Sequence, residues 1–516
     1  MTFSSEAGPG KDQTATDAPL DDSPVQEQPP AKPNTRLLFL LLGGLALLVI
    51  FTPLALTLAQ RPAPAPIAQT TPAASPTPAP TPTETPPAYT PAGTAPTSAQ
   101  CQSLIHAPCY SPEQMQQAFR LTPLYRQGYD GRGQTIVILG TGKTTTLAAD
   151  LHQFDLAWGL PDPTFTILHP FGPPAPYTCA GGMDDLQLEN TLDVEWSHAM
   201  APGASIILLI GSNDSGGPRS ANCAYAGLLD ALAYAVDQHL GSVISISYGG
   251  SELGDISESA SEKAQDRRFF NQAHALFERA AKAGITVLAS SGDDGATNFN
   301  SFSNPSSVWD HPNISWPASD PAVLAVGGTS LALADANGLY GSETVWNAGG
   351  GSTGGGLSAV FQEPDYQHAI PDQTVLHGKR GIPDISFPAA VNYALYGSFL
   401  IGELGAHRSQ WSHWDIIGGT SASAPCWAGL IAIANQMRGK PLGLVQPALY
   451  SLIGREMHDI ITGDNSLHGV TGYQARPGYD LASGWGTPIA DTFLPALIQA
   501  ADLLAAGCPN RYRACP

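Results

Sequence analysis

Apolar runs and helical stretches alternate along the chain between residues 135 and 290. The apolar runs have the length of buried strands, and each is followed by a Gly- or Ser-rich turn: Thr135–Leu139, Ala204–Ile210, Ser242–Ser247 and Thr286–Ala289. The stretches between them have helical spacing: Leu188–Met200, Ala221–Gln238 and Phe269–Ala283. Buried strands that alternate with helices predict an α/β fold, with a mainly parallel β-sheet and helices on both faces. In such sheets, chemistry gathers in the loops beyond the strand ends.

The N-terminal part of the chain shows no such alternation. Residues 1–36 are polar, acidic and rich in Pro, which predicts a disordered tail. Residues 37–59 are 23 residues without a charge, long enough to cross a hydrocarbon core of about 30 Å, and predict a transmembrane anchor. Residues 60–99 are rich in Pro, Thr and Ala and predict an extended polyproline II stalk. We expect one globular domain over residues 100–516.

The charges beside the apolar segment set its expected orientation. Lys32 and Arg36 precede the segment, whereas Arg61 alone follows it closely. This excess favours a cytoplasmic tail and a single-pass protein of the cell membrane, with the globular domain outside the cytoplasm. The alternative is a cleaved signal peptide, because Thr57 and Ala59 could supply a small-residue cleavage site. The protein would then be secreted.

Composition and cysteine spacing narrow the class of protein further. The net charge of -21 argues against nucleic acid as a partner, because phosphate binding needs clustered Lys and Arg. Seven cysteines occur without a CxxC pair or a Cys/His cluster: Cys101, Cys109, Cys179, Cys223, Cys426, Cys508 and Cys515. In a domain outside the cytoplasm six could form three disulfides, and close spacing favours Cys101–Cys109 and Cys508–Cys515. Cys426 would remain as a thiol buried in a helix.

The sharpest chemical signal is the octet Gly418-Gly-Thr-Ser-Ala-Ser-Ala-Pro425, which leads into an apolar stretch, Cys426–Met437, that predicts a helix. Pro425 suits a first helical turn, where a missing N–H costs nothing. A serine at such a helix start has an exposed hydroxyl, and its backbone N–H can point at a developing oxyanion. By itself, however, a Ser/Thr-rich helix start is more often only a cap.

The whole octet resembles the nucleophile segment shared by subtilases and sedolisins, which implies Ser421 as the nucleophile. A subtilisin-like enzyme would also carry an Asp at the end of its first strand and a His-Gly-Thr-His helix. Neither is present, and Gly140 stands at the strand end. Instead, Glu189 and Asp193 are spaced i, i+4 in a predicted helix, which places both carboxylates on one face. Such a pair is ordinarily a solvated surface, but this segment resembles the base motif of the sedolisin family of serine-carboxyl peptidases.

A third segment, Ser290-Ser-Gly-Asp-Asp-Gly295, follows a predicted strand. It resembles the sedolisin loop whose first Asp completes the oxyanion hole, which implies that role for Asp293. A carboxyl group donates a hydrogen bond only when it is protonated. A Glu base also suits acid, where a histidine would already be protonated. The resemblance therefore implies a subtilisin-like fold and an endopeptidase that cleaves polypeptides in acidic surroundings.

The resemblance also implies one structural calcium ion near the C-terminus. Its ligands would be two carboxylates and three backbone carbonyls, from Asp459, Ile460, Arg476, Gly478 and Asp480. Isolated acids in Gly-rich loops are otherwise surface turns. Some sedolisins extend their proton network with a Glu at the first strand end and a Trp after a later strand, where this chain has Gly140 and Tyr248.

Two other functions can be weighed against a peptidase. Gly142-Lys-Thr144 after a strand resembles the end of a phosphate loop, but Val137 stands where that pattern needs its first glycine, so we expect no nucleotide binding. The stronger alternative is a catalytically silent binding module on a peptidase scaffold. The presence of all four expected catalytic residues argues against it.

Overall fold

The computed structural model describes residues 94–142, 144–172, 183–212, 222–254, 259–300, 307–390, 392–400 and 413–507. All of them belong to one compact unit, Glu84–Pro516. The predicted tail and anchor, and the stalk up to residue 93, lie outside the described residues. Within the described ranges, no helix is both long and apolar enough to span a membrane.

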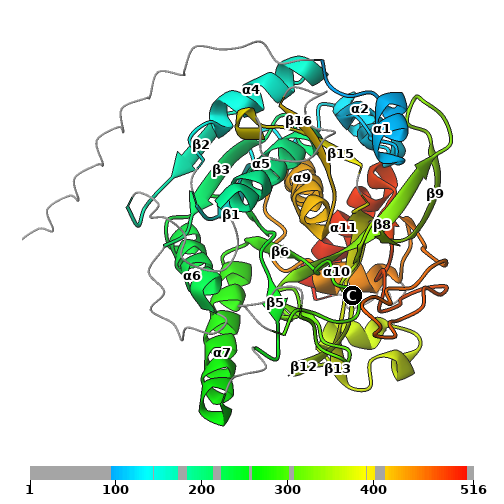
Figure 1. Ribbon diagram of the computed structural model, residues 1–516. Helices are drawn as coiled ribbons and strands as arrows, with labels where there is room; N and C mark the ends of the chain where they lie inside the picture. Colours follow the sequence, from blue (N-terminus) through cyan, green and yellow to red (C-terminus); the bar gives the residue numbers. More distant parts are fainter. Residues whose placement is uncertain are drawn as a thin grey trace, which may run out of the picture. The chain divides into compact units, whose positions relative to one another are not determined.

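A mainly parallel sheet forms the centre of the unit (Figure 1). In the described part of the chain it has eight strands in the order β14-β8-β6-β4-β1-β3-β2, with β9 antiparallel to β8. The strands are β1 (Thr135–Gly140), β2 (Phe165–Leu168), β3 (Ser205–Ile210), β4 (Val243–Ile246), β6 (Thr286–Ser290), β8 (Leu324–Leu333), β9 (Tyr340–Val345) and β14 (Ile385–Pro388). The four strands predicted from the apolar runs are confirmed to within one residue at either end.

Side chains of β1 alternate between two hydrophobic clusters, one on each face of the sheet. Ile136 and Ile138 pack with α5 (Met183–Met200) and α9 (Thr420–Arg438). Val137 and Leu139 pack with α6 (Asn222–Asp237) and α7 (Ala260–Lys282). Helices therefore cover both faces of the sheet, as the sequence pattern predicts, and Figure 1 shows α6 and α7 on the side away from α9.

The remaining elements surround this sheet. The other helices are α1 (Ser98–Ile105), α2 (Pro112–Ala118), α3 (Thr122–Tyr125), α4 (Leu147–Trp158), α10 (Gln446–Leu452) and α11 (Ala490–Ala505), with short 3-10 turns η1 (Asp365–Ala369), η2 (Gln373–Val375) and η3 (Ser398–Leu400). The small strand pairs are β5 (Gly250–Ser251) with β7 (Ser315–Trp316), β10 (Asn347–Ala348) with β11 (Gly351–Ser352), β12 (Gly356–Gln362) with β13 (Lys379–Ile382), β15 (Tyr393–Tyr396) with β16 (Trp414–Ile417), and β17 (Met457–His458) with β18 (Thr487–Pro488).

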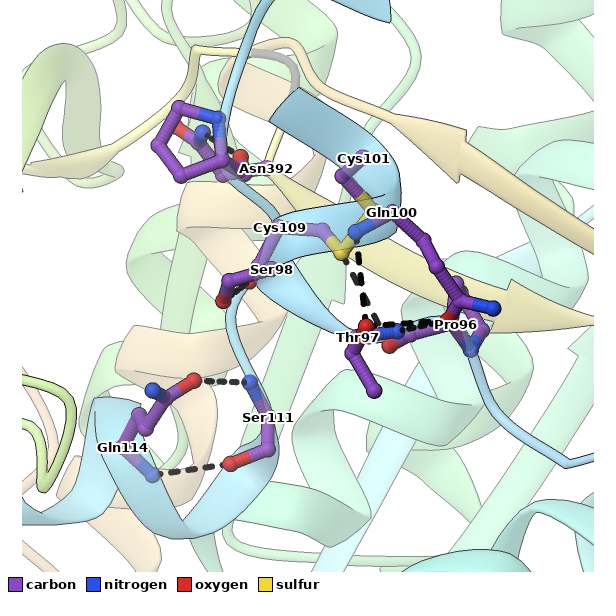
Figure 2. The surroundings of a disulfide bond; sticks show 10 residues. Pro96, Thr97, Ser98, Gln100, Cys101, Cys109, Ser111, Gln114 and Asn392 are labelled. Atoms are coloured by element: carbon purple, nitrogen blue, oxygen red, sulfur yellow. Dashed lines mark hydrogen bonds between the residues drawn. A yellow bond between two sulfur atoms is a disulfide. The ribbon is translucent and has the colours of Figure 1, made fainter. Parts of the chain in front are cut away.

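A disulfide fastens the start of the unit (Figure 2). It joins Cys101 in α1 to Cys109, with their Cα atoms 5.7 Å apart, and confirms the pairing predicted from spacing. The Ser98 hydroxyl donates to the Cys109 carbonyl, and the Asn392 amide donates to the carbonyl of Pro108. The first helix is thus tied to the segment beside β15. The predicted Cys508–Cys515 pair lies outside the described residues.

Helix α9 lies against the sheet and is buried along most of its length. Cys426 is a buried free thiol, as predicted. The helix begins earlier than the sequence predicts, at Thr420 after Gly419, whose φ is 117°. Pro425 therefore lies in the second turn, and its predicted place in the first turn is wrong. The helix tolerates it there because the carbonyl oxygen of Ser421 has another hydrogen-bond donor, the side chain of Ser247.

Candidate active site

Helix α5 places two carboxyl groups together beneath the nucleophile helix. Asp193 is fully buried. Burial is the main cause that raises the pKa of Glu189 to about 8; the Asp293 charge adds to the rise, and the hydroxyls of Ser421 and Ser247 oppose it. Burial, followed by the Glu189 charge, raises the pKa of Asp193 well above its ordinary range. The two carboxyls are one turn of helix apart, so they titrate together and hold a proton that one ordinary glutamate would have lost.

Within the described residues, one oxygen of each carboxyl group lacks a hydrogen bond. Among the residues that the structure describes, no hydrogen bond reaches Glu189 Oε1 or Asp193 Oδ2, although both atoms are buried. Two ionised carboxylates at this depth would repel one another, because water does not screen their charges there. Protonation of the pair would relieve this repulsion.

Ser421 is the second residue of α9 and lies at the start of the helix, where backbone N–H groups have no helical partner. Its hydroxyl is near enough to the Glu189 carboxyl to lower the pKa of that group. The structure thus brings the predicted nucleophile to the predicted base, although more than 200 residues separate them in the chain.

Asp293 follows β6 and reaches the same helix start. Its Oδ1 accepts two hydrogen bonds from Thr420, one from the backbone N–H at 2.8 Å and one from the hydroxyl at 2.8 Å. Burial raises the pKa of Asp293, with these two bonds opposing the rise. Because Oδ1 is occupied by donors, the neutral form carries its proton on Oδ2. A Cβ added at Gly419 would lie 2.6 Å from that oxygen, so Asp293 occupies the space of a side chain at 419.

The structure explains both departures from the sedolisin pattern. A Cβ on Gly140 would lie 2.4 Å from the side-chain oxygen of Asn190, so a side chain at the end of β1 would require Asn190 to move. Asn190 is fully buried and donates to the Thr141 carbonyl at 2.7 Å, while the Tyr248 hydroxyl donates to its amide oxygen at 3.2 Å. The neutral amide of Asn190 and the phenol of Tyr248 therefore occupy the region where an extended proton network would need a further carboxyl group.

Comparison with known proteins identifies the family. The model described as the Subtilase family matches residues 179–465, more than half of the chain, and this range includes all four candidate catalytic residues. The chain belongs to the subtilase family.

Kumamolisin and sedolisin are among the similar curated proteins. Kumamolisin from Bacillus sp. (strain MN-32) is 36% identical over 405 residues, which cover 76% of this chain and 64% of kumamolisin. Sedolisin from Pseudomonas sp. (strain 101) is 32% identical over 365 residues, which cover 68% of this chain and 56% of sedolisin. The chain thus spans less than two thirds of the length of these relatives.

A solved structure agrees with this placement. It is Pseudomonas sedolisin, described as a serine-carboxyl proteinase, in complex with two molecules of pseudo-iodotyrostatin; its TM-score is 0.61 at 27% identity, and the match covers 77% of this chain and 99% of that chain. The subtilisin-like fold is confirmed. Within the subtilases, the chain belongs to the sedolisin branch.

The five residues predicted to bind a metal lie around one loop of this subtilase. The backbone N–H of Gly478 donates to Asp459 Oδ2 at 2.9 Å, and that of Arg476 donates to Asp480 Oδ2 at 3.0 Å. The two carboxyl groups therefore hold the same short segment from two sides. Asp480 is almost fully buried, and burial raises its pKa to about 6 although several backbone donors oppose the rise.

The oxygen atoms around this loop suit a hard cation. Within the described residues, no hydrogen-bond donor reaches the carbonyl oxygens of Ile460, Arg476 or Gly478. The same part of the chain has no cluster of three or more His, Cys, Asp or Glu side chains that could hold a metal. A cation at this loop would therefore depend on the two carboxylates and the three carbonyls, which is an all-oxygen set of the kind that calcium takes.

Three residues of the site are absent from the sequence-based prediction: Ser247, Thr420 and Asn190. Ser247 follows β4, and a polar residue at the carboxyl end of a central parallel strand is the signal that could have found it. Asn190 lies directly after Glu189, on a helix turn already assigned to the base. Thr420 lies in the octet itself, but its sequence gives no indication that it would hold Asp293.

Proposed function

We propose that this protein is a serine-carboxyl endopeptidase that hydrolyses polypeptides in acidic surroundings. The observation that carries the proposal is the meeting of Glu189, Asp293 and Ser421, from three distant segments, at the start of α9. A nucleophile beside a base, with a hydrogen-bond donor on the other side, is what acyl transfer needs.

The first half of the reaction forms an acyl-enzyme. Ser421 Oγ attacks the carbonyl carbon of the scissile peptide while the Glu189–Asp193 pair, which has one negative charge, accepts the hydroxyl proton through Glu189. Charge develops on the carbonyl oxygen, where the Ser421 N–H and the protonated Oδ2 of Asp293 donate hydrogen bonds. The C–N bond then breaks as Glu189 returns the proton to the leaving amine.

In the second half, water takes the place of the amine. Glu189 accepts a proton from the water as its oxygen attacks the acyl carbon, and the ester bond to Ser421 breaks with return of the proton to the serine. Both halves need one ionised carboxyl in the pair and a neutral Asp293. Activity should therefore fall in strong acid, where the pair becomes fully protonated, and again as Asp293 ionises.

The test uses the full chain and a denatured protein as the substrate between pH 3 and pH 7. Ser421→Ala and Glu189→Gln should each remove nearly all hydrolysis, as removal of a nucleophile or its base does in hydrolases of this type. Glu195→Gln is the matched control, since Glu195 is another buried carboxyl of α5 that binds the backbone N–H of Tyr396 instead. Normal turnover in either active-site variant would overturn the assignment. The alternative function is a catalytically silent binding module. It would be favoured if the folded wild-type chain shows no turnover and Ser421 is not acylated.

We also propose one structural calcium ion at the loop held by Asp459 and Asp480. The ion would neutralise two carboxylates, one of them buried, and join segments around Ile460, Arg476 and Gly478 that are separate in the chain. It would act on stability and would take no part in the peptidase chemistry.

For location, we propose a single-pass protein of the cell membrane with the peptidase unit outside the cytoplasm. The uncharged segment at 37–59 supports the anchor. The Cys101–Cys109 disulfide supports an oxidising compartment. The partners are polypeptide substrates, with neither nucleic acid nor nucleotide among them.

A further inference from the structure

Ser247 is a buried hydroxyl between the helix of the base and the helix of the nucleophile. It directly follows β4, which lies in the middle of the sheet between β1 and β6. Its exposed fraction is 8%. Most buried polar side chains have hydrogen-bond partners, and Ser247 is one of these.

Its two partners belong to different helices. Ser247 Oγ lies 2.7 Å from Asp193 Oδ1 on α5 and 3.3 Å from the carbonyl oxygen of Ser421 on α9. The hydroxyl has one hydrogen, so the shorter contact to Asp193 takes most of it and the carbonyl is the second acceptor. One side chain thus connects the base pair with the backbone of the nucleophile.

The carbonyl of Ser421 is free to accept because of Pro425. In a regular helix, this oxygen would accept from the N–H four residues later. That residue is proline, which has no N–H. Pro425 therefore leaves the Ser421 carbonyl without a helical donor, and the hydroxyl of Ser247, directly after β4, donates to it.

We propose that Ser247 is a positioning residue of the peptidase reaction, whose hydroxyl holds the Asp193 carboxyl against the turn of α9 that carries Ser421. The inference rests on the proposed function, since it assumes that Ser421 and the Glu189–Asp193 pair perform the chemistry. Ser247 would set the distance between base and nucleophile without itself exchanging a proton with the substrate.

The chain offers a close control in Ser245. It lies in β4, two residues before Ser247, and is fully buried. In the described part of the structure its hydroxyl has no hydrogen-bond partner. Removing this hydroxyl should leave the site unchanged, whereas removing that of Ser247 should disturb it.

The experiment measures kcat and KM of the full chain with a fluorogenic peptide across the acid pH range. Ser247→Ala should lower kcat by about 10- to 100-fold, the effect of one hydrogen bond to a charged group, with KM changed by no more than about twofold. Ser245→Ala should retain wild-type kcat. Ser247→Thr, which keeps a hydroxyl, should recover most of the loss.

The pH profile separates positioning from simple packing. The titratable groups that face the pair are Asp293 and the thiol of Cys426. The Ser247 hydroxyl lowers the pKa of both Glu189 and Asp193. Without it the pair needs a higher pH to lose a proton, so the acid limb of kcat should move to higher pH. A loss of packing would lower the melting temperature and leave this limb in place.

Pro425→Ala tests the second contact. It gives the Ser421 carbonyl a helical donor, so the loss caused by Ser247→Ala should be smaller in this background. An equal loss in both backgrounds would contradict the link to Ser421. A Ser247→Ala variant with a normal kcat and a normal acid limb, or with a change in KM alone, would overturn the proposal for Ser247. The proposed function would still stand in that case if Ser421→Ala is inactive. If Ser247→Ala does not fold, Ser247→Thr becomes the test. The proposal for Ser247 is then overturned if Ser247→Thr loses the wild-type kcat and the wild-type acid limb.

Discussion

The stability of the folded chain should fall as the pH rises through the range of one buried carboxyl, that of Glu343 in β9. Its exposed fraction is 8%. Thr329 donates to Oε1 at 2.5 Å, and Thr487 donates to Oε2. Burial raises the pKa of Glu343 from an ordinary 4.5 to about 7, against the lowering effect of these hydroxyls.

The sign and size follow from proton linkage. Below pH ~4.5 the carboxyl is neutral in both the folded and the unfolded chain, and it imposes no penalty. Above this pH the unfolded chain loses the proton first, so the unfolding free energy falls until the folded group also ionises near pH 7. Because one unit of pKa corresponds to about 1.4 kcal/mol, the loss amounts to about 3 kcal/mol for Glu343.

Glu343→Gln keeps the shape of the side chain and removes the titration. Urea unfolding of the full chain at a series of pH values measures the effect, in a Ser421→Ala parent so that the protein does not digest itself. The fall in unfolding free energy between pH 4.5 and pH 7 should be smaller by about 3 kcal/mol in the variant than in the parent. Thr487→Val removes a donor and should extend the fall to higher pH. The reasoning is refuted if parent and Glu343→Gln lose stability in parallel.

Two further predictions concern the site and the metal. Gly419→Ala should lower kcat about 100-fold, because the added Cβ would lie 2.6 Å from Asp293 Oδ2 and would displace a proposed donor of the oxyanion hole. The control is Gly439→Ala, at the other end of α9. No atom lies within 4 Å of the Cβ added there, so this variant should lose stability and keep its kcat. EDTA should lower the melting temperature by a few degrees by removing the proposed calcium ion, since a ligand at 100 times its Kd stabilises a protein by about 2.7 kcal/mol. In Asp480→Asn, EDTA should leave the melting temperature unchanged. Wild-type kcat in Gly419→Ala, or a melting temperature that EDTA leaves unchanged, would contradict the respective argument.

The sheet and the base helix could be predicted because their signals are local. The run from Thr135 to Leu139 is apolar at every position after Thr135, as expected of a strand covered on both faces, and it forms β1. The spacing of Glu189 and Asp193 requires one helix face whatever the helix packs against. The resemblance of the octet then predicts Ser421 as the nucleophile.

The contacts between segments could not be predicted in the same way. Nothing in the sequence near Ser247 shows that it faces a carbonyl of α9, because that contact depends on the packing of α9 against β4. The predicted place of Pro425 was wrong for the same reason. Propensity alone puts proline in the first turn of a helix, but the Ser247 hydroxyl replaces the missing N–H and permits Pro425 in the second turn. Sequence shows Gly140 as a departure, but only the structure shows Asn190 in the space that a larger residue would need.

The raised pKa values in the site and in the body of the protein have one cause, the burial of carboxyl groups away from cations. Arg380 pairs with Asp384 deep in the unit, but the buried groups Glu189, Asp193 and Glu343 have hydroxyls, or each other, as neighbours. Hydroxyl donors offset part of the desolvation and a cation would offset more. Because these groups have hydroxyls as partners and no cations, protonation stabilises the folded state. The acidity that the proposed reaction needs to neutralise Asp293 should therefore also stabilise the fold around it. A peptidase built in this way should therefore lose stability and activity over the same pH range as it moves toward neutral solution.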